Sequence, residues 1–228
     1  MPAPWLHLTS GPGLAAFNMA LDEALLEAVA HLGHVVFRTY AWAEPAATFG
    51  YFQRWTEVER MTLLRPLVRR PTGGGLVPHV NDWTYSLVVP PQHDWYALAA
   101  VNSYQRLHEW MAAAFALLGL PTQLAATACA GRPGQCFAGA TQADLLWRGR
   151  KVAGAAQRRT RHGLLIQGSV QPIPEPLSRA ELAVAVRQAA TPGLAPHWLT
   201  MEPTADLVDR ALRLADEKYS RQEYNRRR

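Results

Sequence analysis

A run of three glycines between two strand-like segments is the feature that most limits how this chain can fold. Gly73, Gly74 and Gly75 follow a short strand-like stretch at 67–70 and precede an alternating stretch at 83–89. Three successive glycines cost about 1 kcal/mol each in chain entropy, and a simple hairpin turn needs only one or two. Their backbone N–H groups can lie close to a ligand, and Arg69 and Arg70 before them supply positive charge. The run predicts a strand-to-strand loop that holds a carboxyl, acyl or phosphate group.

Apolar spacing along the rest of the chain predicts both helices and strands. Apolar residues that recur every three or four positions predict helices over 14–29, 96–118, 179–189 and 204–219. Short β-prone runs predict strands over 35–40, 47–51, 67–70, 83–89, 145–147, 152–157 and 164–170. The alternation at 83–89 predicts a strand with one buried face. Strands in antiparallel succession beside long helices indicate an α+β fold, a single domain over 1–228 with a largely antiparallel mixed sheet flanked by helices.

Composition narrows the class of protein. The chain has 228 residues, of which 49% are hydrophobic, enough for one buried core. No apolar stretch is long enough to span a membrane, and the first residues lack the order of a signal peptide. We therefore expect a cytoplasmic protein with no membrane partner.

The positive charge admits two kinds of partner. A net charge of +5 would suit a nucleic acid, or an acidic protein through long-range attraction. Part of the excess lies in Arg221 and in 226–228, which we interpret as a solvated tail. No RNA-binding or zinc-finger motif accompanies it, so we expect no nucleic-acid partner.

Several positively charged side chains could contact a ligand that is bound at the glycine loop. Arg69 and Arg70 occupy adjacent strand positions and so point to opposite faces; we expect Arg70, nearer the loop, to face the ligand. His79 is either a structural histidine or a pocket residue. Lys151 is either solvated or, beside the small residues at 153–156, a cation that reaches into space left open for a ligand.

The two cysteines are the candidate nucleophiles. Cys129 lies in an apolar alanine stretch, whereas Cys136 lies in a loop-like segment with Arg132 nearby in sequence and Lys151 expected nearby in space. Neighbouring cations raise the thiolate fraction of a cysteine, and apolar burial lowers it. Cys136 is the better candidate, although both could be small core residues. Their separation matches no usual zinc spacing, and we expect no bound metal.

Blocks spread over most of the chain resemble the lipoate-protein ligase and octanoyltransferase family of the biotin/lipoate ligase superfamily. The blocks are 18–24, 50–53, 69–75 with His79, 149–157, and Lys218-Tyr219 with Asn225. The resemblance implies the α+β catalytic domain of that superfamily. It also implies that the glycine loop and Lys151 line an acyl pocket. The residues it places in substrate binding are Arg70, Thr72, Gly73, Gly74, Gly75, His79, Gly154, Ala155, Gln167 and Gly168.

Cys136, some fifteen residues before Lys151, is most similar to the branch of octanoyltransferases that use a cysteine in this loop. That branch implies Cys136 and Lys151 as catalytic residues, octanoyl-acyl carrier protein as donor, and a lipoyl domain or glycine-cleavage H-type protein as acceptor. It requires no cofactor. We expect the protein to act as a monomer.

Three alternatives stay open. In an ATP-dependent lipoate-protein ligase, which would use ATP and Mg, Lys151 would hold an acyl-adenylate and no cysteine would be needed. Gly75 favours that alternative, since the cysteine branch often has arginine there. A second octanoyltransferase type places its cysteine near 168, where this chain has Gln167-Gly168 and no thiol. Gln167 also stands where the family usually has histidine. The third alternative is a carrier-protein or lipoyl-domain binder without turnover.

Overall fold

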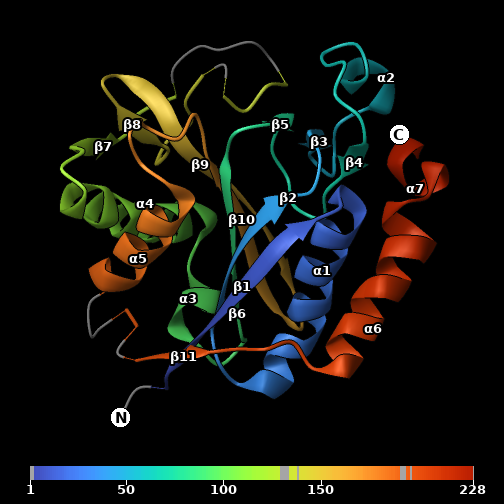
Figure 1. The fold of residues 1–228 in the computed structure, drawn as a ribbon, viewed down its shortest axis with the longest axis horizontal. Coiled ribbons are helices and arrows are strands. Elements are labelled where there is room, and N and C mark those ends of the chain that lie inside the picture. Colours follow the sequence, from blue (N-terminus) through green and yellow to red (C-terminus); the bar gives the residue numbers. More distant parts are fainter. Residues whose placement is uncertain (1–2, 129–133, 138, 191–193, 196, 228) are drawn as a thin grey trace.

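The computed structural model describes residues 3–128, 134–137, 139–190, 194–195 and 197–227. Two sheets organise these residues (Figure 1). Within the described residues the larger sheet has eight strands, in the spatial order β11 (Trp198–Thr200), β1 (Trp5–Gly13), β2 (Val36–Trp42), β6 (Trp83–Val89), β10 (Gly163–Val170), β9 (Arg150–Thr160), β8 (Leu145–Trp147) and β7 (Thr122–Leu124). The β11–β1 and β1–β2 pairs are parallel, and the others are antiparallel. The expected fold class, a largely antiparallel mixed sheet flanked by helices, is confirmed.

The smaller sheet carries the glycine loop. Strand β3 (Ala46–Phe49) pairs in parallel with β4 (Leu67–Arg69) and antiparallel with β5 (Val77–His79). The triglycine run joins β4 to β5, as predicted for a strand-to-strand loop. An isolated β-bridge connects the segment that contains Cys136 to the end of the glycine loop. The N–H of Leu76 donates to the carbonyl of Gly134, and the N–H of Cys136 donates to the carbonyl of Leu76.

Helices cover both faces of the larger sheet (Figure 1). On one face lie α1 (Ala15–Leu32), α6 (Ala205–Leu214) and the π-helical turn η1 (Ala215–Tyr219). On the other lie α4 (Ala100–Leu117), α5 (Arg179–Ala189) and the short α3 (Asp94–Ala97). The short helices α2 (Trp55–Val58) and α7 (Gln222–Arg226) lie beside the smaller sheet. No helix in the described ranges is long and apolar enough to cross a membrane.

Two elements differ from the sequence predictions for clear reasons. All seven residues of β6 are buried, not one face, because the strand is central and helices pack on both sides. The helix predicted over 96–118 is broken: Leu98 and Ala99 are extended, and α4 begins afterwards. The break lets Trp95 enter the core, where its indole N–H donates to Ser103 Oγ at 2.7 Å.

Arg226 and Arg227 do not belong to a free tail. Residues 222–226 form α7, and the buried Asn225 accepts hydrogen bonds from the backbone N–H and the guanidinium of Arg69. Arg226 and Arg227, although exposed, lie over the rings of Trp55 and Tyr51. The chain end therefore fastens the strand that leads into the glycine loop.

Candidate active site

A narrow pocket lies between the larger sheet and the smaller sheet, with an empty volume, open mouth included, of about 460 Å³. Eight of the predicted site residues line it: Arg70, His79, Cys136, Lys151, Gly154, Ala155, Gln167 and Gly168. Further lining comes from residues that the sequence reasoning missed, namely Met19, Tyr40, Trp42, Thr48, Val77, Thr84, Phe137, Ala156 and Ser169. Residues far apart in the sequence thus share one cavity.

The thiol of Cys136 lies against the glycine loop. The backbone N–H of Gly75 donates to Sγ at 2.9 Å, and Nη2 of Arg70 lies 4.0 Å from the same atom. A Cβ on Gly74, whose φ is +84°, would come within 3.4 Å of Sγ. The loop therefore brings a backbone donor and a guanidinium to the sulfur, and glycine leaves room for both.

Arg70 also fixes the shape of the loop. Its guanidinium is buried and donates to the carbonyls of Gly73 and Gly75. Arg69 points the other way, to the carbonyls of Tyr51 and Gln53. The predicted division of the two arginines between opposite faces is confirmed.

The remaining loop residues lie around the pocket, not on its wall. The hydroxyl of Thr72 donates to Gln167 Oε1 at 2.7 Å and so joins the loop to β10. Gly73 borders a separate surface depression with Tyr51 and Phe52. Cys129 and Arg132 lie outside the described residues.

A β-bulge aims Lys151 at the pocket. Leu145 of β8 pairs with Ala153 of β9 but Leu146 pairs with Lys151, so Val152 is an extra residue. Without the bulge, Lys151 and Gly154 would face opposite sides of the sheet. With it they share a face, and a Cβ on Gly154 would lie 2.6 Å from Lys151 Nζ.

The ammonium of Lys151 has two fixed partners. Nζ lies 2.7 Å from Asp144 Oδ2 and donates to the backbone carbonyl of Cys136 at 2.8 Å. Both side chains of the ion pair are buried. Asp144 is itself held by the backbone N–H and hydroxyl of Thr141. Asp144 was missed by the sequence reasoning, although a buried lysine requires a carboxylate and this one directly precedes the hairpin.

His108 of α4 supports the turn that carries Asp144. Its Nδ1 lies 2.5 Å from the carbonyl of Ala143, which has a φ of +69°. Burial lowers the pKa of His108 from 6.5 to about 4, so the ring is neutral at pH 7.

This shift predicts a loss of stability in acid. Below pH 6.5 the unfolded chain binds a proton at His108 that the folded protein does not bind until about pH 4. The free energy of unfolding should therefore fall between pH 6.5 and 4, by about 1.4 kcal/mol per pH unit from this group. Urea unfolding at pH 7, 6 and 5 tests it, with His108→Gln as the comparison. Equal pH slopes in the two proteins would contradict the prediction.

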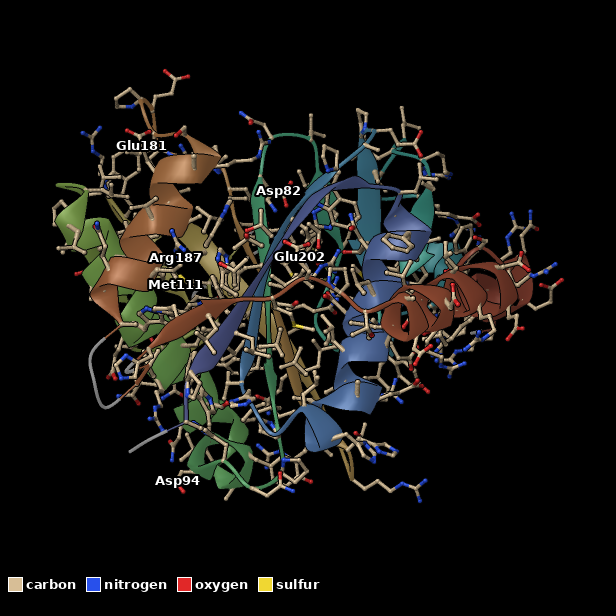
Figure 2. The ribbon with its side chains drawn as sticks, turned by 60° about the horizontal axis from the view of Figure 1, so that its bottom comes forward. Asp82, Asp94, Met111, Glu181, Arg187 and Glu202 are labelled. Atoms are coloured by element: carbon tan, nitrogen blue, oxygen red, sulfur yellow. The ribbon has the colours of Figure 1, made fainter. Side chains whose placement is uncertain are left out.

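A second polar network surrounds Asp82, whose partners His79, Thr84 and Ser169 line the pocket. Asp82 lies among the strands, whereas Glu181 and Asp94 lie at the periphery (Figure 2). Asp82 Oδ2 accepts hydrogen bonds from His79 Nδ1 at 2.7 Å and from the hydroxyls of Thr84 and Ser169. Burial would raise the pKa of Asp82, but these hydrogen bonds outweigh burial and lower it.

His79 is thereby locked in place. Burial lowers its pKa despite the neighbouring Asp82. Its other nitrogen, Nε2, lies 2.9 Å from Thr48 Oγ1, and the ring of Trp42 stacks on it at 3.8 Å. Because Arg70 Nη1 also donates to Thr48, a chain of contacts joins Asp82 to the guanidinium beside the thiol.

Gly154 and Gly73 offer a matched pair of substitutions. A methyl group at Gly154 would meet the end of the Lys151 side chain, which can move, whereas nothing lies within 4 Å of one at Gly73. We expect Gly154→Ala to displace the ammonium and lower activity about tenfold or more. Because the displacement disturbs the buried pair with Asp144, the melting temperature should fall as well. Gly73→Ala should change neither quantity. Thermal unfolding and initial rates of acyl transfer, the activity that the sequence resemblance implies, test both, and full activity in Gly154→Ala would refute the steric argument.

Known proteins match this chain in sequence. A sequence model of the lipoyl protein ligase A/B catalytic domain matches residues 15–172. The octanoyltransferase LipM of Oceanobacillus iheyensis is 35% identical over 177 residues, which cover 75% of this chain and 64% of that protein. The chain thus matches just under two thirds of the length of this relative.

Solved structures share the fold at low identity. A protein from T. acidophilum with bound lipoic acid has a TM-score of 0.81 and 19% identity, covering 99% of this chain and 100% of that one. A lipoate-protein ligase A bound with ATP has a TM-score of 0.78 and 19% identity, covering 98% and 99%. The two sheets and their helical layers are therefore a known arrangement.

Proposed function

The chain belongs to the lipoyl protein ligase A/B catalytic domain family, and on this premise we propose that it is an octanoyltransferase of protein lipoylation. One observation carries the proposal: the partly exposed Cys136 and the buried ammonium of Lys151 line one pocket, and the ammonium donates to the backbone carbonyl of Cys136. The names of its LipM relatives support the same activity.

In the first step the thiolate of Cys136 attacks the carbonyl carbon of an octanoyl thioester on an acyl carrier protein. The new C–S bond forms, the bond to the phosphopantetheine sulfur breaks, and that sulfur leaves as a thiol with the proton that Cys136 gave up. In the second step the amine of an acceptor lysine attacks the acyl-enzyme. An amide forms, the C–Sγ bond breaks, and the amine proton returns to Cys136.

Lys151 and Gly75 would stabilise the charge that develops in both steps. Negative charge gathers on the carbonyl oxygen as each tetrahedral intermediate forms. Lys151 Nζ is fixed by Asp144 beside Cys136, and the N–H of Gly75 already points at the sulfur. The Gly75 N–H would stabilise the thiolate, and the Lys151 ammonium, fixed before substrate binds, would be the donor to the oxyanion.

The proposed transfer needs no energy from a nucleotide. Exchange of one thioester for another is nearly balanced, and amide formation from a thioester is downhill. The acceptor would be a lipoyl domain or an H-type protein, and acidic carrier and acceptor domains would be attracted by the net charge of +5. In this proposal the protein works in the cytoplasm as a monomer.

Intact-mass spectrometry tests the proposal. The protein is mixed with octanoyl-acyl carrier protein without ATP, and we expect a mass increase of one octanoyl group. Cys136→Ser should remove the adduct, and Cys129→Ser, the matched substitution at the other cysteine, should keep it. No adduct on the wild type, with acceptor modification only when ATP and lipoate are added, would favour the ligase alternative. A Cys136→Ser protein that keeps full function in cells would favour the non-catalytic binder.

A further inference from the structure

A second depression lies beside the acyl pocket, next to Lys151; we call it the groove. It shares Phe137 and Lys151 with the pocket, and its outer wall is formed by the β8–β9 hairpin. In Figure 1 this hairpin lies at the opposite side of the upper edge from α2 and the smaller sheet. A ligand in this groove would contact Phe137 and Lys151, which also line the acyl pocket with Cys136.

The turn of this hairpin has an unusual residue. Trp147 pairs with Arg150, so the turn consists of Arg148 and Gly149, with φ values of +50° and +74°. Such turns favour Asn-Gly, because a left-handed residue with a side chain costs about 1–2 kcal/mol. An arginine at this position is not explained by the turn itself.

The groove is positively charged. Arg148 and Arg150 are both exposed at its outer end, and the guanidinium of Arg148 lies 4.5 Å above the ring of Trp147. The described residues that line the groove include these two arginines and Lys151, itself paired with Asp144, but no carboxylate. Stacking on a ring leaves the edge N–H groups of a guanidinium able to bind a phosphate.

We propose that this groove binds the phosphopantetheine arm of the acyl donor. Arg148 and Arg150 contact the phosphodiester at the outer end, and the arm passes Phe137 so that its thioester reaches Cys136. The inference rests on the proposed octanoyl transfer and adds where the donor binds. It also separates donor from acceptor, since the acceptor lysine carries no phosphate.

The other basic depression near the pocket fits this ligand less well. Arg158 and Arg159 line it together with Tyr51 and Phe52. Arg158 lies 3.9 Å from Glu23, and Arg159 donates to the carbonyl of Leu98. These two arginines already have partners, and they provide a matched control of equal charge.

The test compares two small thioesters that differ only in the phosphate. Acylation of Cys136 is followed by intact mass with octanoyl-phosphopantetheine and with octanoyl-pantetheine. In the double variant Arg148→Gln/Arg150→Gln, we expect kcat/KM to fall about tenfold or more with the phosphorylated donor and to stay unchanged with the other. Arg158→Gln/Arg159→Gln should leave both values unchanged.

The second half-reaction provides the counter-check. Variant protein loaded through octanoyl-pantetheine should transfer octanoyl to a lipoyl domain at the wild-type rate. Equal losses with both donors, no loss with either, or a slower second half-reaction would each overturn the phosphate site. Wild-type protein that neither thioester nor octanoyl-acyl carrier protein acylates would overturn the proposed function itself, and this inference with it.

Discussion

Replacing Lys151 with glutamine is expected to slow acylation of Cys136 by about 10²–10³-fold, the usual cost of losing one preorganised donor to an oxyanion. The ammonium is held 2.7 Å from Asp144 and hydrogen-bonded to the backbone of Cys136. The nearby guanidinium of Arg70 is committed to the carbonyls of Gly73 and Gly75. Single-turnover acylation by octanoyl-acyl carrier protein, followed by intact mass, measures the effect.

The chain supplies a matched control, because it contains only one other lysine, Lys218. Like Lys151, it forms an ion pair with a carboxylate, that of Glu23. We expect Lys218→Gln to acylate Cys136 at the wild-type rate. A Lys151→Gln protein that does the same would exclude Lys151 from the chemistry.

Replacing Asp22 with alanine should cost about 3–5 kcal/mol in the free energy of unfolding. Asp22 and Arg38 form an ion pair at 2.7 Å with both side chains fully buried. Asp22 also accepts hydrogen bonds from Ser86 and from Gln167, and Gln167 in turn holds Thr72. The substitution leaves a buried guanidinium without its counter-charge and loosens the support of the glycine loop.

Urea unfolding measures this loss, and Glu27→Ala is the matched control. Glu27 also pairs with an arginine, Arg210, at 2.7 Å, but that pair is about 40% exposed. Exposed pairs contribute about 0–1 kcal/mol, so the control should unfold near the wild-type midpoint. Similar losses in the two variants would mean that burial does not decide the strength of the Asp22 pair.

Periodicity predicted the elements whose own residues carry the signal. The helix at 179–189 was placed at its observed bounds, and the strand at 164–170 within one residue. Strand β1 was missed because Ser10, Gly11 and Pro12 interrupt its alternation, and parallel pairing with β2 forms it regardless. Short strands such as β11 likewise depend on partners distant in the sequence.

The sequence predicted which residues form the site better than it predicted the contacts between them. The glycine loop, Cys136 and Lys151 could be chosen from residue type and resemblance; their roles stay predictions. The bulge at Val152 has no sequence signal, yet it decides which face of β9 Lys151 occupies. Asp144 and Asp82 act through contacts with residues that only the fold brings near.

The ion pair between Lys151 and Asp144 also affects how long an enzyme of this kind would stay active. An acyl group on Cys136 would lie beside a primary amine of the protein itself, and an S-to-N shift would convert it into a permanent amide. An ammonium ion has no lone pair with which to attack, and this one is held away from such a role by Asp144 at 2.7 Å and by the backbone carbonyl of Cys136. The ion pair that positions the ammonium for the substrate would thus also prevent Lys151 from accepting the acyl group of Cys136.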